Sequence, residues 1–91
     1  MLKIIDGVLA NGASQVPVPS GALGGILIAV DGTNAATVVI KAGDSNGKII
    51  FSIISYSPIF IVAPVWCEGK QQIYASCTGT SAGLSLYEWV P

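Results

Sequence analysis

The feature that most constrains this chain is a series of short apolar runs rich in Val, Ile and aromatic residues, separated by Gly, Asn, Asp and Pro. The runs recur about every 8 to 14 residues, and no segment has a sustained helical period. This pattern is typical of all-β sandwiches and barrels. We predict one domain over residues 1–91, a single antiparallel β-sandwich of the jelly-roll or Ig-like kind with seven to eight short strands.

The strands are bounded by turn residues. We expect Asp6-Gly7 to close a tight hairpin, and the tetrads at 31–34 (DGTN) and 44–47 (DSNG) to form turns. Pro17 and Pro19 cannot donate to a strand ladder, so residues 11–24 are predicted to form an extended arm or an edge segment. The predicted strands are Leu2 to Ile5, Val8 to Ala10, Gly25 to Val30, Ala36 to Lys41, Lys48 to Ile54, Ile59 to Val65, Gln72 to Thr78 and Leu84 to Val90.

Alternation along the strands predicts which side chains face the core. The last two strands are expected to form a hairpin that carries Tyr74, Tyr87 and Trp89 outward in one aromatic patch. Alternation turns Glu88 inward, so either Glu88 lies past the core at the end of its strand or the face assignment slips by one residue there. The run from Lys48 to Ile54 is apolar on both sides, which favours a strand covered on both faces. The predicted core residues are Val38, Ile40, Ile73, Ala75, Cys77, Leu84 and Leu86.

Charged residues are scarce in this chain. Of its 91 residues, four are Lys and five are Asp or Glu, and it has neither His nor Arg. The chain therefore lacks the usual general base near neutral pH, the commonest metal ligand and the bidentate anion clamp. The scattered lysines form no basic stripe for a phosphate backbone. We predict no enzyme, no catalytic residue, no cofactor, no metal site and no nucleic-acid partner.

Acidic and thiol side chains were the remaining candidates for chemistry. Asp31 and Asp44 would form a carboxylate pair if their turns met at one end of the sandwich, but Asp in short turns usually bonds the local backbone. The stretch GDSNG does not match the calcium-loop pattern. Cys67 and Cys77 match neither a CxxC pair nor a zinc set, which leaves two packed thiols, a disulfide or a reactive thiol.

A stretch of 19 residues from Ile49 to Cys67 contains no charge, and its length would suit a membrane span. Ser-Tyr-Ser-Pro at 55–58 and a second proline at Pro64 interrupt it, so we predict two strands and a turn, and no membrane partner. Asp6 and Gly7 interrupt any apolar leader, which indicates a chain made in a cytoplasm.

The motifs DGTNAATV (31–38) and IYASCTGTSAGLSLYEWV (73–90) resemble a pattern of small virion proteins from tailed bacteriophages, over residues 25–90. The resemblance implies a compact β-sandwich located on the virion, as a capsid decoration or cement protein or as a neck or tail component. The chain departs from that pattern in its C-terminal EWVP and in its longer N-terminal segment, which contains prolines.

These observations predict a structural virion protein that binds and bridges coat subunits. The expected partners are the major capsid protein or other virion proteins, with the chain homo-oligomeric or bound to a lattice. Low surface charge suits a protein that is attached to others. Partner-contact residues are predicted at Tyr74, Tyr87, Trp89, Pro17 and Pro19, with the 11–24 segment along a neighbouring subunit. The alternatives are a neck or tail adaptor and a carbohydrate-binding host-attachment module, since aromatic side chains also stack on sugars.

Overall fold

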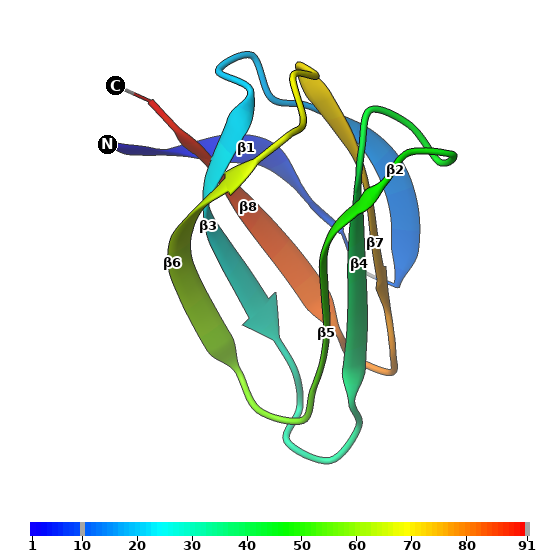
Figure 1. The fold of residues 1–91 in the computed structure, drawn as a ribbon. Helices are drawn as coiled ribbons and strands as arrows, with labels where there is room; N and C mark the ends of the chain where they lie inside the picture. Colours follow the sequence, from blue (N-terminus) through cyan, green and yellow to red (C-terminus); the bar gives the residue numbers. More distant parts are fainter. Residues whose placement is uncertain (10, 91) are drawn as a thin grey trace.

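The chain folds into two four-stranded antiparallel sheets packed face to face (Figure 1). The computed structural model describes residues 1–9 and 11–90, with the exception of the side chains of residues 6–9 and Ala63. The eight strands are β1 (Leu2–Leu9), β2 (Gly12–Pro17), β3 (Ala22–Ala29), β4 (Ala36–Ala42), β5 (Ile49–Ser55), β6 (Ile59–Trp66), β7 (Gln72–Thr78) and β8 (Gly83–Trp89).

The order of the strands identifies the topology. Sheet A has the order β1-β8-β3-β6 and sheet B the order β2-β7-β4-β5. The first strand pairs with the last, the second with the seventh, the third with the sixth and the fourth with the fifth. A long hairpin rolled into two layers gives this pairing, so the fold is a jelly roll, and of the two predicted kinds the Ig-like one is excluded.

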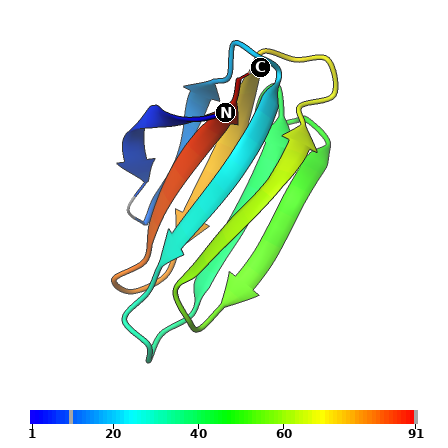
Figure 2. The same ribbon diagram turned by 90° about the vertical axis from the view of Figure 1, so that its left-hand side faces the viewer.

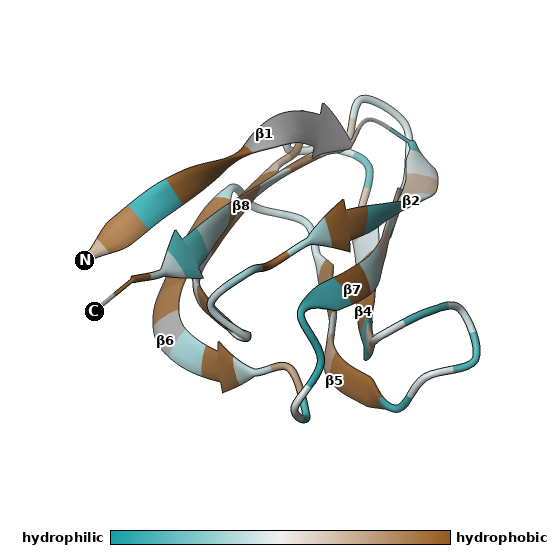
Figure 3. Cartoon of the chain, turned by 90° about the horizontal axis from the view of Figure 1, so that it is seen from above, coloured by the Kyte–Doolittle hydropathy of each residue, from teal (hydrophilic) through white to brown (hydrophobic). Residues whose placement is uncertain are grey.

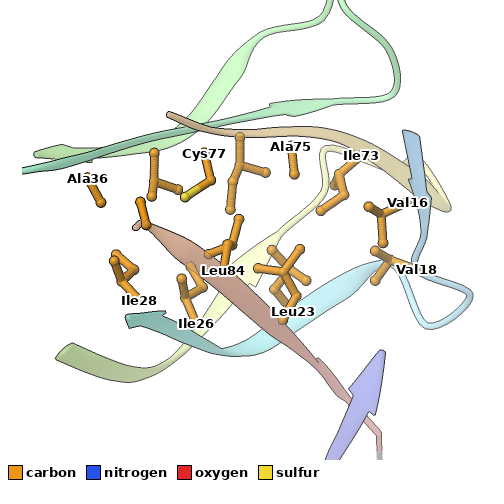
Figure 4. Close-up of a cluster of buried hydrophobic side chains, with 14 of the residues drawn as sticks. Val16, Val18, Leu23, Ile26, Ile28, Ala36, Ile73, Ala75, Cys77 and Leu84 are labelled. Atoms are coloured by element: carbon orange, nitrogen blue, oxygen red, sulfur yellow. The ribbon is translucent and has the colours of Figure 1, made fainter. Parts of the chain in front are cut away.

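The core lies between the sheets and has the side-chain period of strands (Figure 4). In β4, β7 and β8 every second side chain is buried. All seven predicted core residues are buried, and so are both cysteines, which are free thiols. Burial raises the pKa of both thiols, because a thiolate is poorly solvated there. Of the three alternatives for the cysteines, two packed thiols is therefore confirmed.

The N-terminal third differs from the prediction in two places. The backbone of β1 continues through Asp6 and Gly7 with a register shift between Ile4 and Val8, so the predicted hairpin there is wrong. Ala10 of the second predicted strand lies outside the described residues. Residues 11–24 are an edge segment and not a free arm, because β2 pairs with β7 and Val16, Val18 and Leu23 are buried in the core.

The prediction that the last two strands form a hairpin fails, because the loop between them crosses from one sheet to the other. The turns at 31–34 and 79–82 each link one sheet to the other, so β7 and β8 are not a hairpin. The loops before and after β4, which contain Asp31 and Asp44, lie at opposite ends of that strand, roughly 23 Å long for its seven residues (Figure 1). The two side chains therefore form no carboxylate pair, and the expected bonding of Asp to the local backbone is confirmed. Each accepts hydrogen bonds from its own turn, as for Asn46 N to Asp44 Oδ1 at 2.9 Å.

The charge-free stretch 49–67 forms β5, the loop at 56–58 and β6. The predicted turn at Ser-Tyr-Ser-Pro is confirmed, and within the described residues no helix has the length and apolarity needed to span a membrane. The strand covered on both faces is β3, in which four consecutive residues from Leu23 to Ile26 are buried. The corresponding prediction for β5 is wrong, because β5 is an edge strand and exposes Ile49 and Ile54.

Candidate interaction surface

The outer face of sheet A is the principal candidate for a functional surface. Register and alternation place the outward side chains of its four strands. They include Leu2, Ile4, Leu27, Phe60, Val62, Ser85, Tyr87 and Trp89. We call this set, with the glycines Gly24 and Gly25 beneath it, the aromatic face. Its hydrogen-bonding side-chain groups are the hydroxyls of Ser85 and Tyr87 and the indole N–H of Trp89, and none of the set carries a formal charge.

Two glycines in β3 make the floor of the aromatic face. A Cβ atom at Gly25 would lie 3.1 Å from Cε1 of Phe60 and 3.3 Å from Cβ of Tyr87. A Cβ atom at Gly24 would lie against Cδ2 of Leu2 and 3.2 Å from the Cα atom of Trp89. Side chains from the strands on both sides of β3 thus lie flat across it, because β3 has no side chain there.

Two of the rings on the aromatic face contact each other. Phe60 and Tyr87 meet edge to face, with ring centroids 5.4 Å apart and an interplanar angle of 65°. This geometry fits the positive edge of one ring against the negative face of the other. Tyr87 is half-buried, whereas Phe60 and Trp89 remain 47% and 41% exposed. The face therefore presents large, preordered aromatic surface to its surroundings.

Glu88 shows how charge is kept off the aromatic face. The prediction that Glu88 faces inward is confirmed, because it is 7% exposed and its Oε2 accepts a hydrogen bond from Ser20 N at 2.6 Å. It also lines a small hollow of about 250 Å³ beside Lys3, Pro17 and Pro19. Charge-assisted bonding to a backbone N–H compensates for the burial of a carboxylate.

The predicted contact residues divide between three places. Tyr87 and Trp89 lie together on the aromatic face. Pro17 and Pro19 are exposed at the rim between β1 and β2, where they line the hollow with Ile4. Tyr74 lies on the opposite side of the molecule, on the outer face of sheet B in register with Gln15 and Lys41. The single patch expected from Tyr74, Tyr87 and Trp89 is therefore not formed.

The sequence analysis missed Ile4, Phe60 and Val62, which expose much of their side chains on the aromatic face. The available signal was the absence of charge over β6 and the two glycines of β3, which together indicate an uncharged sheet surface. The charge-free sequence by itself predicts only two strands and a turn. Local sequence does not show which face of a strand is left uncovered.

A second apolar region follows the side of the sandwich where β5 and β6 lie next to each other (Figure 2). Of the exposed large apolar side chains, those on this side that are not on the aromatic face are Ile49, Ile54, Tyr56, Ile59 and Trp66. Brown segments mark β5 and β6 in Figure 3. We call this region the β5–β6 side. At one end it has an open hollow of about 380 Å³, lined by Trp66 and crossed by a Lys48–Glu68 ion pair of 3.5 Å.

Groups for chemistry are sparse in the part of the chain that the structure describes. No set of three or more Cys, Asp or Glu side chains gathers there in a way that would hold a metal ion. The pKa of Asp31 is lowered by hydrogen bonds from the backbone and side chain of Asn34 and from Thr33 N, which are turn contacts on a fully exposed loop. The arrangement is suited to contact between surfaces.

Comparison with protein-family models, with curated proteins and with solved structures finds no match. The resemblance to phage virion proteins thus rests on the motifs at 31–38 and 73–90.

Proposed function

We propose that this chain is a non-enzymatic structural protein of a bacteriophage particle, a capsid decoration or cement protein that binds coat subunits through the aromatic face. The observation that carries the proposal is a set of described outward side chains on sheet A without formal charge, among which Phe60, Trp89, Ile4 and Val62 are each about half exposed. A soluble monomer seldom leaves a large continuous apolar surface of this kind in water. The jelly-roll topology is compatible, since the same architecture recurs in viral capsid and lectin domains.

The size of the aromatic face indicates how the chain would attach. The exposed parts of Phe60, Trp89, Ile4 and Val62 together amount to roughly 400 Å², or about 10 kcal/mol when buried. Association itself costs about 4 to 15 kcal/mol. One copy on one coat subunit is therefore held weakly. Contact with two neighbouring coat subunits, or attachment of linked copies, would make the binding firm.

Counting the copies in purified particles tests the proposal. Quantitative mass spectrometry of the virions of the phage that encodes the chain should find hundreds of copies per particle, and an image reconstruction should place the aromatic face against the outer capsid surface. A few copies at one vertex would support a neck or tail adaptor instead. Absence of the chain from the particle would reject a structural role.

A carbohydrate-binding host-attachment module is the second candidate, and the exposed rings of Phe60 and Trp89 favour it. Sugar hydroxyls need hydrogen-bonding groups beside the stacked ring. The aromatic face offers the hydroxyls of Ser85 and Tyr87 and the indole N–H of Trp89, but none of its residues has a carboxylate or amide side chain, so the protein partner is better supported. Saturable quenching of Trp fluorescence by host glycans, in the isolated chain, would reverse this preference.

A further inference from the structure

We infer that the β5 edge binds a second copy of this chain, with the two β5 strands antiparallel across a two-fold axis and sheet B continuous through both copies. The inference concerns a different surface from the aromatic face and does not depend on the proposed function. It begins from the four strand edges that the two sheets leave unpaired, those of β1, β2, β5 and β6.

Three of the four edges carry features that hinder pairing with another strand. Charge, proline and bulges are the usual means by which natural sheets protect their edges. The β1 edge contains Lys3 and a register shift, the β2 edge ends in Pro17, and the β6 edge contains Pro64 and a register shift against β3.

The β5 edge is the exception. Its sequence, IIFSIIS, contains no charge, proline or glycine. Ile50 forms a bulge near its start, but from Phe51 to Ser55 the strand pairs with β4 without interruption. Its outward residues are apolar or small, with Ile54 65% exposed. A regular edge of this composition is expected to add a strand from outside.

The geometry of the β5–β6 side favours a second copy over a single foreign strand. Both layers are open there, since Phe51 and Ile53 of β5 and Ile61 of β6 pack on the core but stay only partly buried. A single added strand would cover β5 and leave β6 bare. A second sandwich with the same spacing of about 10 Å between its sheets would continue both layers, and the copies' β6 strands would cover each other.

The charges permit this self-association. Two antiparallel β5 strands place the two Lys48 side chains at opposite ends of the interface, about 20 Å apart and beyond the Debye length of about 8 to 10 Å. No like charges face each other over β5 itself. The two-fold arrangement uses each β5 edge once, so it closes at a dimer and does not extend into a fibre.

The area suggests a weak dimer. Seven residues of β5 span about 23 Å, and two layers with their side chains are about 20 Å thick, so each copy would bury roughly 450 Å². The total is slightly below the roughly 1,000 Å² that a biological interface usually exceeds. We therefore expect reversible association with a Kd between about 10 µM and 1 mM, strengthened wherever copies are held at high local concentration.

Sedimentation velocity of the purified chain from about 1 µM to about 1 mM tests the dimer. The wild type should shift from monomer to dimer, and Ile54→Lys should stay monomeric throughout. Ile4→Lys is the matched control, because it makes the same change at a site 56% exposed on a different edge strand, and it should dimerise like the wild type. A wild type that is monomeric at the highest concentration, or equal effects of both variants, would overturn the inference.

Hydrogen exchange tests the strand pairing without a variant. Those amides of residues 51–55 that point away from β4 should gain protection as the wild-type concentration rises, while the amides of β1 should not change. Association without this protection would show that another surface pairs and would reject the β5 edge. Loss of particle binding in an aromatic-face variant that still dimerises would concern the proposed function alone.

Discussion

The outer faces of the two sheets are built from the same strand geometry but differ in chemistry. On sheet B the outward residues form three rungs across the strands. The rungs are Gln15-Tyr74-Lys41-Ile49, Ala13-Ser76-Val39-Ser52 and Thr78-Thr37-Ile54. Seven of these eleven side chains can form hydrogen bonds, which is the usual alternation of a sheet with one wet face.

Sheet A has no such alternation toward polar residues. Its corresponding rungs, such as Ile4-Tyr87-Gly25-Val62, are apolar or aromatic, and its central strand β3 lacks side chains where rings lie across it. Both faces belong to one small domain, so overall composition does not explain the difference. The two faces thus differ in how many of their outward positions hold hydrogen-bonding side chains, and the proposed attachment through sheet A rests on this difference.

The largest effect is expected from filling the floor of the aromatic face. Gly24→Val places a branched side chain against Leu2 and the backbone of Trp89, and overpacking there should lower the free energy of unfolding by about 3 kcal/mol. Urea unfolding measures it. Ala13→Val enlarges an exposed side chain on sheet B and should change stability by less than about 0.5 kcal/mol. Equal losses in both variants would remove the distinction between the faces.

Removing one ring from each face compares their roles in binding. Trp89→Ala should weaken attachment to particles about 30-fold, since a central aromatic contact contributes about 2 kcal/mol. Tyr74→Ala, on sheet B, should weaken it less than about 3-fold. Pelleting of labelled protein with particles gives the affinities. If Trp89→Ala unfolds the chain as much as it impairs binding, Trp89 is a packing residue and not a contact.

A smaller effect is expected at the second glycine. Gly25→Ala brings a methyl group to 3.1 Å from Phe60, which must move by a few tenths of an ångström and alter its contact with Tyr87. We expect a loss of about 1 kcal/mol and a changed near-ultraviolet circular dichroism spectrum. Thr37→Val on sheet B should leave that spectrum as it is. An unchanged spectrum in Gly25→Ala would mean that the ring pair does not depend on the glycine.

The sequence predicted what depends on neighbouring residues. Alternation in β4, β7 and β8 located the core, because strand side chains alternate whatever the sheet contains. The inward direction of Glu88 followed from the same rule. The turn at 55–58 was identifiable because proline and serine stop strands.

The sequence pattern does not show which strands lie in the same sheet. In this topology only β4 and β5 are consecutive strands that are also neighbours in a sheet. The residues of a turn such as 79–82 are the same whether the turn joins two strands of one sheet or links the two sheets. The prediction therefore placed Tyr74 on the wrong side of the molecule. For the same reason β5 was taken as a covered strand, although its apolar outer face lies at an edge. The face to which a ring belongs is set by long-range pairing.

The smallest effect concerns the loops, which carry charge that the aromatic face lacks. Hydrogen bonds from Asn34 and Thr33 lower the pKa of Asp31, so its carboxylate is favoured in the folded state. A depressed folded pKa adds stability above the unfolded pKa near 3.8, and the stability is lost as pH falls through the lower folded pKa. Asp31→Ala should therefore lower the Tm slightly at pH 7, and the difference from wild type should shrink at pH 2. Calorimetry at the two pH values measures it, and a difference that persists at pH 2 would assign the effect to packing of the loop, not to the charge.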